Sequence, residues 1–271
     1  MEFISAIIYG IIQGLTEFLP VSSSGHLALL PHILEIDDPG VLFDLSMHVG
    51  TALSILIYFF KDIKLLFVQS SHLLTDALRG KGIDHKNSWA FNMIISTITT
   101  VIFIFILKPL AFQYGRNPFS MVITLSAFGF FMFIADTFKK DTDHLYMNRI
   151  QWGKSFWIGL FQALAIFPGV SRSGSTLTVS RQLGLGREEA TRFSFLLSLP
   201  IIFAGFFYKL PEIFKGDIHF DFVSLFLGIA VSFVVGLLTI HYFLKFIKKI
   251  GLLYFSIYRL ILALFVYYYL V

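Results

Sequence analysis

The sequence predicts an all-α polytopic membrane protein with six transmembrane helices plus two re-entrant helical hairpins in an inverted-topology repeat. Three observations lead to this prediction: an apolar fraction of 56% with only 14% charged residues, a series of long apolar runs, and two similar polar segments far apart in the chain. A soluble domain of 271 residues could hold so much apolar surface only by leaving almost none for water. Lipid is therefore the expected solvent.

Six apolar runs of about 19 to 23 residues are each long enough to cross a hydrocarbon core of about 30 Å as a helix. They are residues 41–60, 89–107, 119–137, 190–208, 222–244 and 252–271. The chain has no cysteine, which excludes a disulfide framework and a thiolate nucleophile. Its net charge of +4 is modest, and the basic residues lie mostly between the spans, so nucleic-acid binding is not expected.

Two shorter apolar stretches, 1–19 and 152–167, end in polar loops that contain glycine, and these loops resemble each other. Segments 12–27 and 161–176 align at an offset of 149 residues with seven identities in sixteen positions. Biased composition could give seven matches, but each copy also has the same order: apolar helix, proline, Ser/Gly loop, short helix, full span. This order favours a true repeat, with halves of approximately 1–140 and 150–271 in one integral membrane domain.

Each helix–loop–helix segment is too short to cross the bilayer twice, so both are expected to be re-entrant hairpins, which need protein or a wet cavity around them. Three spans lie between the hairpins, so the second hairpin enters from the opposite face, as in an inverted repeat. The segment 63–78 has a polar face. It is expected to be an interfacial amphipathic helix or, equally, a short solvated loop helix.

Basic residues between the spans predict the orientation, because cytoplasmic loops carry an excess of Lys and Arg. Twelve lie on one side: Lys61, Lys64, Arg79, Lys81, Lys86, Lys139, Lys140, Arg149, Lys154, Lys245, Lys248 and Lys249. Four lie on the other: Lys108, Arg116, Lys209 and Lys215. The first set is therefore predicted to be cytoplasmic and both termini extracytoplasmic.

The first hairpin tip carries polar residues that would be costly at membrane depth unless they are used. Gln13 and Glu17 are four residues apart and share one helix face. Pro20 ends this helix, and segment 22–25 (Ser-Ser-Ser-Gly) turns into the helix that bears His26. The start of that helix offers unpaired N–H groups suited to phosphate oxygens. The alternative is an ordinary serine N-cap with a satisfied histidine.

The second tip, 168–176 (PGVSRSGST), places one arginine among glycines and hydroxyls. Glycines permit close backbone approach, and the guanidinium of Arg172 offers a fork of donors that matches phosphate. Hydroxyl groups add neutral hydrogen bonds; they belong to Ser171, Ser173 and Thr176. The alternative is that Arg172 forms a structural pair with Glu17, and both can hold before substrate arrives.

These two motifs resemble those of the undecaprenyl-diphosphate phosphatase family of bacterial membranes, also called bacitracin-resistance proteins. The resemblance rests on Gln13-x-x-x-Glu17 with the following PVSSSGH, on PGVSRSGST, on FSFLLSLP at 193–200 and on IYR at 257–259. It implies hydrolysis of undecaprenyl diphosphate to the monophosphate that carries peptidoglycan precursors for the cell wall, and resistance to bacitracin. It also implies a multi-pass protein of the bacterial cytoplasmic (inner) membrane, an active site open to the outer face, and a homodimer.

The resemblance further implies the roles of individual residues. The catalytic residues would be Glu17, His26, Arg172 and Ser23. Substrate-binding residues would be Gln13, Ser22, Ser24, Ser171, Ser173, Gly174 and Thr176. A divalent cation, Mg²⁺ or Ca²⁺, is implied, with Glu17 as its ligand. Several relatives have Glu at the position of Gln13, and glutamine cannot act as an acid, a base or a charged metal ligand.

The residues themselves leave the mechanism open. Arg172 and N–H groups of the second hairpin are expected to hold the diphosphate, because phosphoryl transfer depends on positioning and charge stabilisation. Glu17 would bind the cation or orient His26, and His26 would serve as general base or acid toward Ser23 or a water molecule. A phosphoseryl intermediate and direct hydrolysis are both compatible with the sequence.

Other charged residues within the spans are functional candidates as well. Arg259 lies about 12 Å into the last span at 1.5 Å per residue. We expect it either to pair with Asp136 or Asp44 or to cap carbonyl groups; His48, Arg181 and Arg192 are similar cases that the sequence leaves open. The rival function is a secondary transporter or polyprenyl-phosphate flippase, because broken helices in inverted repeats are common in transporters.

Overall fold

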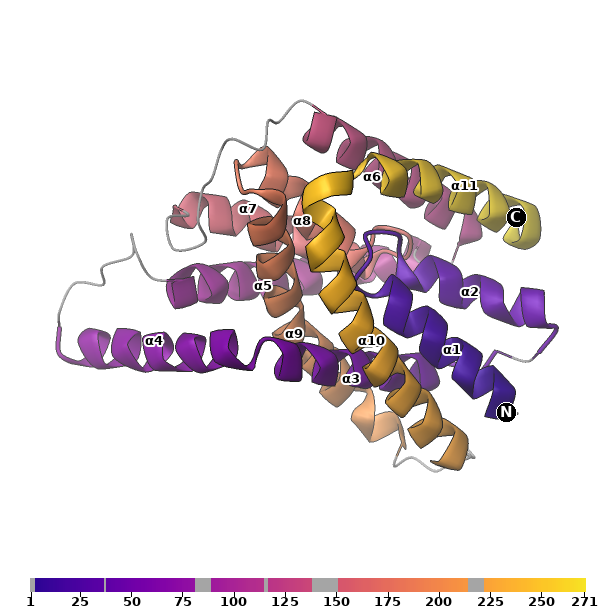
Figure 1. Ribbon diagram of the computed structural model, residues 1–271, viewed down its shortest axis with the longest axis horizontal. Coiled ribbons are helices and arrows are strands. Elements are labelled where there is room, and N and C mark those ends of the chain that lie inside the picture. The colour runs from indigo at the N-terminus through magenta and orange to yellow at the C-terminus, as the bar shows by residue number, and fades with distance from the viewer. Residues whose placement is uncertain (1–2, 37, 81–88, 115–116, 138–150, 214–221) are drawn as a thin grey trace.

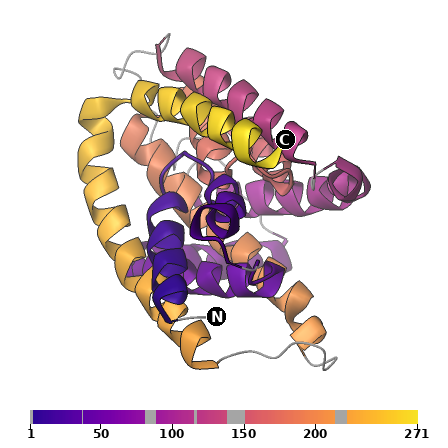
Figure 2. The same cartoon turned by 90° about the vertical axis from the view of Figure 1, so that its right-hand side faces the viewer.

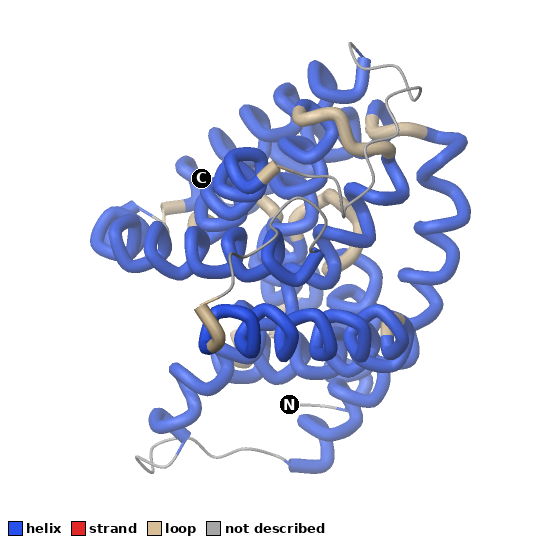
Figure 3. The backbone as a smooth tube through the Cα atoms, turned by 90° about the vertical axis from the view of Figure 1, so that its left-hand side faces the viewer, coloured by secondary structure: helices blue, strands red, loops and turns tan. Residues whose placement is uncertain are grey.

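The computed structural model describes residues 3–36, 38–80, 89–114, 117–137, 151–213 and 222–271, and every regular element in these ranges is a helix (Figures 1 and 3). The helices of the first half are α1 (Phe3–Thr16), α2 (Ser23–Leu34), α3 (Val41–Tyr58), α4 (Phe60–Leu78), α5 (Trp89–Tyr114) and α6 (Pro118–Thr137). Those of the second half are α7 (Trp152–Ala163), η2 (Leu164–Ile166), α8 (Arg172–Gln182), α9 (Arg187–Ile213), α10 (Phe222–Ile250) and α11 (Leu253–Leu270).

Five helices within the described ranges are long and apolar enough to cross a membrane, namely α5, α6, α9 up to Tyr208, α10 and α11. Together with its apolar surface, this makes the chain a multi-pass membrane protein. The sixth predicted span, 41–60, is α3, whose described apolar part, Phe43–Tyr58, is shorter than the other five. That α3 crosses the membrane stays a prediction.

The predicted amphipathic segment 63–78 lies within α4, a helix of 19 residues that contacts α5 and projects beyond it (Figure 1). It has no buried residue, and apolar side chains such as Phe67 and Leu78 are largely exposed. The helix is therefore confirmed, and its position at the membrane interface stays a prediction. The predicted orientation also stays a prediction. Several of its basic residues lie outside the described ranges: Lys81, Lys86, Arg116, Lys139, Lys140, Arg149 and Lys215.

The most extensive helix contacts join the two halves of the chain. α1 packs along α10, α7 packs along α5, and α6 runs beside α11 (Figures 1 and 2). Small residues allow such close approach, as is typical of helix pairs in membranes. A Cβ atom added to Gly14 of α1 would lie only 2.8 Å from the Cβ of Val235 in α10. The exchange of partners brings the C-terminal ends of α1 and α7 into the centre of the molecule.

α8 lies in this centre, and Ser173 to Arg181 are all buried. A polar helix can be buried here because its hydroxyl groups donate back to the preceding turn, so few polar atoms are left without a partner. Thr178 donates to the carbonyl of Gly174 at 2.6 Å, and Ser175 donates to the carbonyl of Arg172 at 3.1 Å. The helix thereby holds the second hairpin tip firmly against its neighbours.

Candidate active site

The two hairpin tips have the same local geometry at aligned positions. Ser22 and Ser171 each have a positive φ, 76° and 69°, and each is the N-cap of the next helix. The Ser22 hydroxyl accepts from the N–H of Gly25 at 3.3 Å, and the Ser171 hydroxyl accepts from the N–H of Gly174 at 3.1 Å. A positive φ is unfavourable for serine, so the cap hydrogen bond offsets part of that strain. Each tip is thus a fixed turn that opens a helix N-terminus.

The two tips meet around one small polar cavity of about 100 Å³. Its wall consists of Glu17, Ser23, Ser24, His48, Ala165, Ser171 and Arg172. Across it, the guanidinium of Arg172 pairs with Oε1 of Glu17. The tips also touch where the N–H of Gly169 donates to Oγ of Ser24 at 3.3 Å. The predicted meeting of Glu17 and Arg172, residues 155 positions apart in the chain, is therefore present in the structure.

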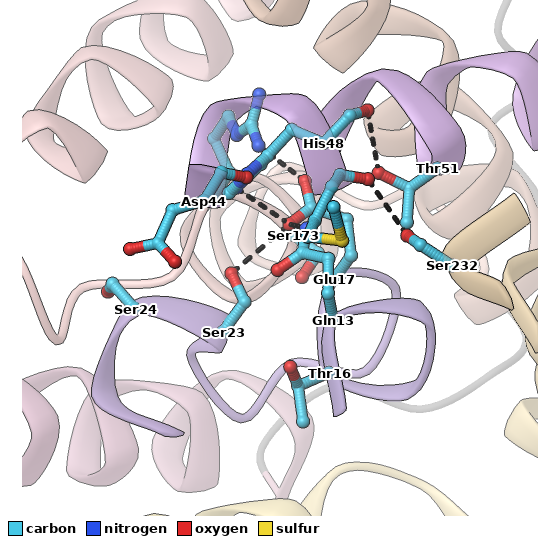
Figure 4. A network of polar contacts seen from close by, with 12 residues as sticks. Gln13, Thr16, Glu17, Ser23, Ser24, Asp44, His48, Thr51, Ser173 and Ser232 are labelled. Atoms are coloured by element: carbon cyan, nitrogen blue, oxygen red, sulfur yellow. Dashed lines mark hydrogen bonds and ion pairs between the residues drawn. The ribbon is translucent and has the colours of Figure 1, made fainter. Parts of the chain in front are cut away.

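Glu17 is the centre of the polar network, and its side chain is only 5% exposed. Its Oε2 accepts from Gln13 Nε2 at 2.9 Å and from Ser23 Oγ at 3.1 Å, and lies 3.3 Å from His48 Nε2 (Figure 4). Its Oε1 takes the guanidinium of Arg172. Four donors around two oxygens match the acceptor-only character of a carboxylate. The hydrogen bond between the charged groups of Arg172 and Glu17 belongs to the stronger class of hydrogen bonds.

The imidazole beside this carboxylate is that of His48, on α3. Its Nδ1 lies 2.8 Å from the backbone carbonyl of Asp44, and its Nε2 faces Glu17. Both neighbours are acceptors, so each ring nitrogen of His48 faces a group to which an N–H can donate. The sequence identified His48 only as an unassigned polar residue within an apolar run. The feature that could have identified it is the energetic cost of a polar side chain within a membrane span, which suggests a function.

His26 does not contact Glu17 in the structure, so the alternative in which Glu17 orients His26 is not seen, and a catalytic role of His26 stays a prediction. Its Nδ1 lies 2.8 Å from the carbonyl of Ser22, and its Nε2 lies 2.7 Å from the hydroxyl of Tyr258, whose ring stacks on it with centroids 5.6 Å apart. A neutral ring satisfies both contacts, because the tyrosine hydroxyl can donate. His26 therefore turns toward α11 and holds the first tip there.

Several predicted substrate-binding residues lie behind the cavity wall. Gln13 is fully buried and supports Glu17, while Ser22 and Gly174 take part in the two caps. The Ser173 hydroxyl donates to the carbonyl of Leu19 at 3.2 Å, and Thr176 donates to the carbonyl of Arg172 at 2.8 Å. These side chains shape the tips. Ser24 and Ser171, by contrast, line the cavity, and their binding of substrate stays a prediction.

Arg259 is fully buried and binds both tips through carbonyl groups. It donates to Pro20 of the first tip at 3.4 Å, to Gly169 and Val170 of the second at 2.6 and 3.1 Å, and to Leu125 of α6 at 3.3 Å. The predicted capping of carbonyls is confirmed. The alternative, a pair with Asp136, is wrong, because Asp136 lies against other guanidinium groups, those of Arg187 at 2.9 Å and Arg181 at 3.4 Å.

The donor set at the cavity does not fit a divalent cation held by the protein alone. Within the described residues, no three His, Cys, Asp or Glu side chains are grouped as such an ion requires. Glu17 is already engaged by two basic side chains, Arg172 and His48, which would repel a further cation. Mg²⁺ or Ca²⁺ at Glu17 remains a prediction.

Comparison with known proteins covers nearly the whole chain. Residues 6–265 match the family described as Bacitracin resistance protein BacA. Undecaprenyl-diphosphatase 1 of Pseudoalteromonas translucida (strain TAC 125) is 38% identical over 263 residues, which is 97% of each chain. Undecaprenyl-diphosphatase of Teredinibacter turnerae (strain ATCC 39867 / T7901) is also 38% identical over 263 residues, with the same coverage of both chains.

Proposed function

Because the chain belongs to the BacA family of bacitracin resistance proteins, we propose that it is an undecaprenyl-diphosphatase. It hydrolyses undecaprenyl diphosphate to undecaprenyl phosphate and inorganic phosphate. The product returns to peptidoglycan synthesis as the lipid carrier, and removal of the diphosphate confers resistance to bacitracin. The observation that carries this proposal is the pairing of Glu17 with Arg172 across the two hairpin tips, beside a serine hydroxyl.

Arg172 supplies the positive charge that the terminal phosphate requires. Its planar fork of donors matches phosphate oxygens, and it stands at the first position of α8, where unpaired N–H groups and the helix dipole also favour an anion. When the diphosphate enters, phosphate oxygens replace Glu17 as partners of the guanidinium. Glu17 is then released from one charge partner and can accept a proton.

Ser23 and Glu17 are placed for the attack. The Ser23 hydroxyl donates to Glu17 Oε2 at 3.1 Å, so its proton already points at a base. In the proposed step the attacking oxygen, from Ser23 or from water, bonds to the terminal phosphorus and gives its proton to Glu17. The bond to the bridging oxygen breaks, and its electron pair leaves with undecaprenyl phosphate. If Ser23 attacks, water then bonds to the phosphorus of the phosphoserine, the bond to Ser23 Oγ breaks, and the proton held by Glu17 returns to Ser23 as inorganic phosphate leaves.

His48 takes the place that the sequence gave to His26. Its Nε2 lies 3.3 Å from Glu17 and it lines the cavity, so it can donate to a phosphate oxygen. His26, held by Ser22 and Tyr258, has a positioning role.

Release of phosphate from an isoprenyl diphosphate by the purified protein in detergent tests the proposal. We expect release by the wild type and its loss in Arg172→Ala, with Arg79→Ala, an exposed arginine at the end of α4, as the matched control. Uptake of the lipid into vesicles without hydrolysis would instead favour the rival reading, a transporter or flippase.

The arrangement in the membrane belongs to the same proposal. The two tips are proposed to enter from opposite faces as an inverted repeat, in a protein of the bacterial cytoplasmic membrane with extracytoplasmic termini and a site open to the outer face. The matching caps at Ser22 and Ser171 and the exchange of helix partners between halves support it. A homodimer stays a prediction from the resemblance.

A further inference from the structure

A second cavity, of about 900 Å³, lies at the other end of α3, between α3, α9 and α10 and at the start of α4. It is separate from the active site, because Tyr58 on its wall is ten residues beyond His48 along α3, or about 15 Å at 1.5 Å per residue. Basic residues dominate its polar wall: Lys61, Arg192, His241, Lys245 and Lys248.

The two acidic residues of this wall are already paired. Asp62 accepts from Arg192 Nη2 at 2.9 and 3.1 Å, and Glu188 pairs with Lys248 at 2.5 Å. Lys61 and Lys245 have no carboxylate partner within the described part of the chain, and both line the cavity. The cavity therefore carries two unneutralised positive charges, contributed by two different helices, α4 and α10.

Apolar side chains make up most of the rest of the wall, and some of them are exposed. Ile57 and Phe60 are 60% and 66% exposed, and Leu244 joins them. Phe60 also begins α4, the amphipathic helix without buried residues. Such a helix lies along the plane between headgroups and acyl chains. A basic pocket between helices at that level, with an apolar side toward the lipid, has the chemistry to bind an anionic headgroup together with its chains.

We propose that this second cavity binds an anionic phospholipid. Lys61 and Lys245 contact the headgroup phosphate, the Tyr58 hydroxyl lies within the same wall, and the acyl chains lie along Ile57 and Phe60. The bound lipid joins α4 to the end of α10. This assignment does not depend on the proposed hydrolysis, because no residue of the cavity lines the active site.

Native mass spectrometry of the purified full-length protein, titrated with phosphatidylglycerol or phosphatidylcholine in detergent, tests the proposal. The double variant K61Q/K245Q removes the two unpaired charges. The matched control K64Q/K249Q removes two exposed lysines from the same helices outside the cavity. At about 1 kcal/mol for each basic residue, we expect roughly 30-fold weaker binding of phosphatidylglycerol in K61Q/K245Q and little change in the control.

Equal losses in both double variants would show general surface attraction and overturn the assignment. Equal binding of phosphatidylcholine and phosphatidylglycerol by the wild type would overturn it too. So would preferential binding of an isoprenyl monophosphate at this cavity, because the occupant would then be product. Phosphate release by each variant, measured in parallel, verifies the fold. If K61Q/K245Q does not fold, the single variant K245Q against K249Q, with an expected difference of about fivefold, decides.

Discussion

Replacement of Glu17 by glutamine is the sharpest perturbation of the proposed active site, because it keeps the shape of the side chain and removes its charge. Glu17 faces Arg172 with one oxygen and three donors with the other. The amide would keep one acceptor oxygen. Its NH₂ group would replace the other oxygen and would face either Arg172 or the three donors, none of which can accept from it in the form they have beside Glu17. One basic side chain, Arg172 or His48, then loses its counter-charge.

The expected cost in stability follows from these contacts. Breaking a fully buried pair costs about 3–5 kcal/mol. Arg172 and His48 are each 18% exposed, and water can reach them in part. The range for a hydrogen bond to a charged group, about 1.5–3 kcal/mol, therefore applies to the fall in the free energy of unfolding. The rate of hydrolysis should fall further, by about 10²–10⁴, because the proton acceptor is removed.

The assay is phosphate release at saturating isoprenyl diphosphate by the Glu17→Gln variant, with denaturation in detergent followed in parallel. Glu35→Gln makes the same chemical change at an exposed side chain, at the C-cap position of α2, and this variant should hydrolyse like the wild type. A Glu17→Gln protein that stays folded and retains more than about a third of the wild-type rate would refute the assignment of Glu17 as the base, because loss of a general base costs at least about 10²-fold.

Three further outcomes are expected. His48→Gln should lower kcat about 10²-fold or more and His26→Gln far less, since only His48 reaches Glu17; the reverse order in the phosphate assay would restore the assignment of His26. Arg259→Lys should lower the free energy of unfolding by about 3 kcal/mol in detergent denaturation, because one ammonium cannot reach four carbonyls; an unchanged midpoint would contradict this. Protein purified without diphosphate should retain no stoichiometric divalent cation by atomic emission, because the cavity groups too few carboxylate and histidine ligands; a retained ion would show that they suffice. EDTA in the phosphate assay tests the predicted need for Mg²⁺ or Ca²⁺.

The fold was largely predictable because lipid imposes a length on apolar runs. Five predicted spans correspond to helices long enough to cross the membrane. Proline and the Ser/Gly turns predicted that the two helices stop before the tips, but α1 ends at Thr16, before Pro20, and α7 ends at Ala163, before Pro168. The pairing of α1 with α10 and of α7 with α5 was not predictable, because apolar helices in lipid choose partners by the fit of small residues such as Gly14 and not by hydrophobicity.

The part of the active site formed by rare charged residues was predictable from the sequence. The part that depends on side-chain direction and helix packing was less predictable. An unpaired charge inside a membrane protein is costly, so a carboxylate and an arginine there are expected to pair. Glu17 and Arg172 could therefore be paired from the sequence. The position of His26 in the chain placed it near the first tip. Its side-chain rotamer points toward Tyr258, so the imidazole contacts α11 and not Glu17. His48 lies on α3, and the sequence does not show how close α3 packs to the end of α1.

The central claim is that the two hairpin tips form one cavity, and chemical cross-linking tests it most directly. The chain has no cysteine, so Ser24→Cys and Ala165→Cys, one on each side of the cavity, can be introduced without background. A short bifunctional thiol reagent applied to membranes should join this pair, an isoprenyl methylenediphosphonate should block the reaction, and a control pair of Ser24→Cys with Tyr58→Cys should stay unjoined. Failure of the 24–165 pair to cross-link while each single cysteine still reacts would show that the tips do not share a cavity.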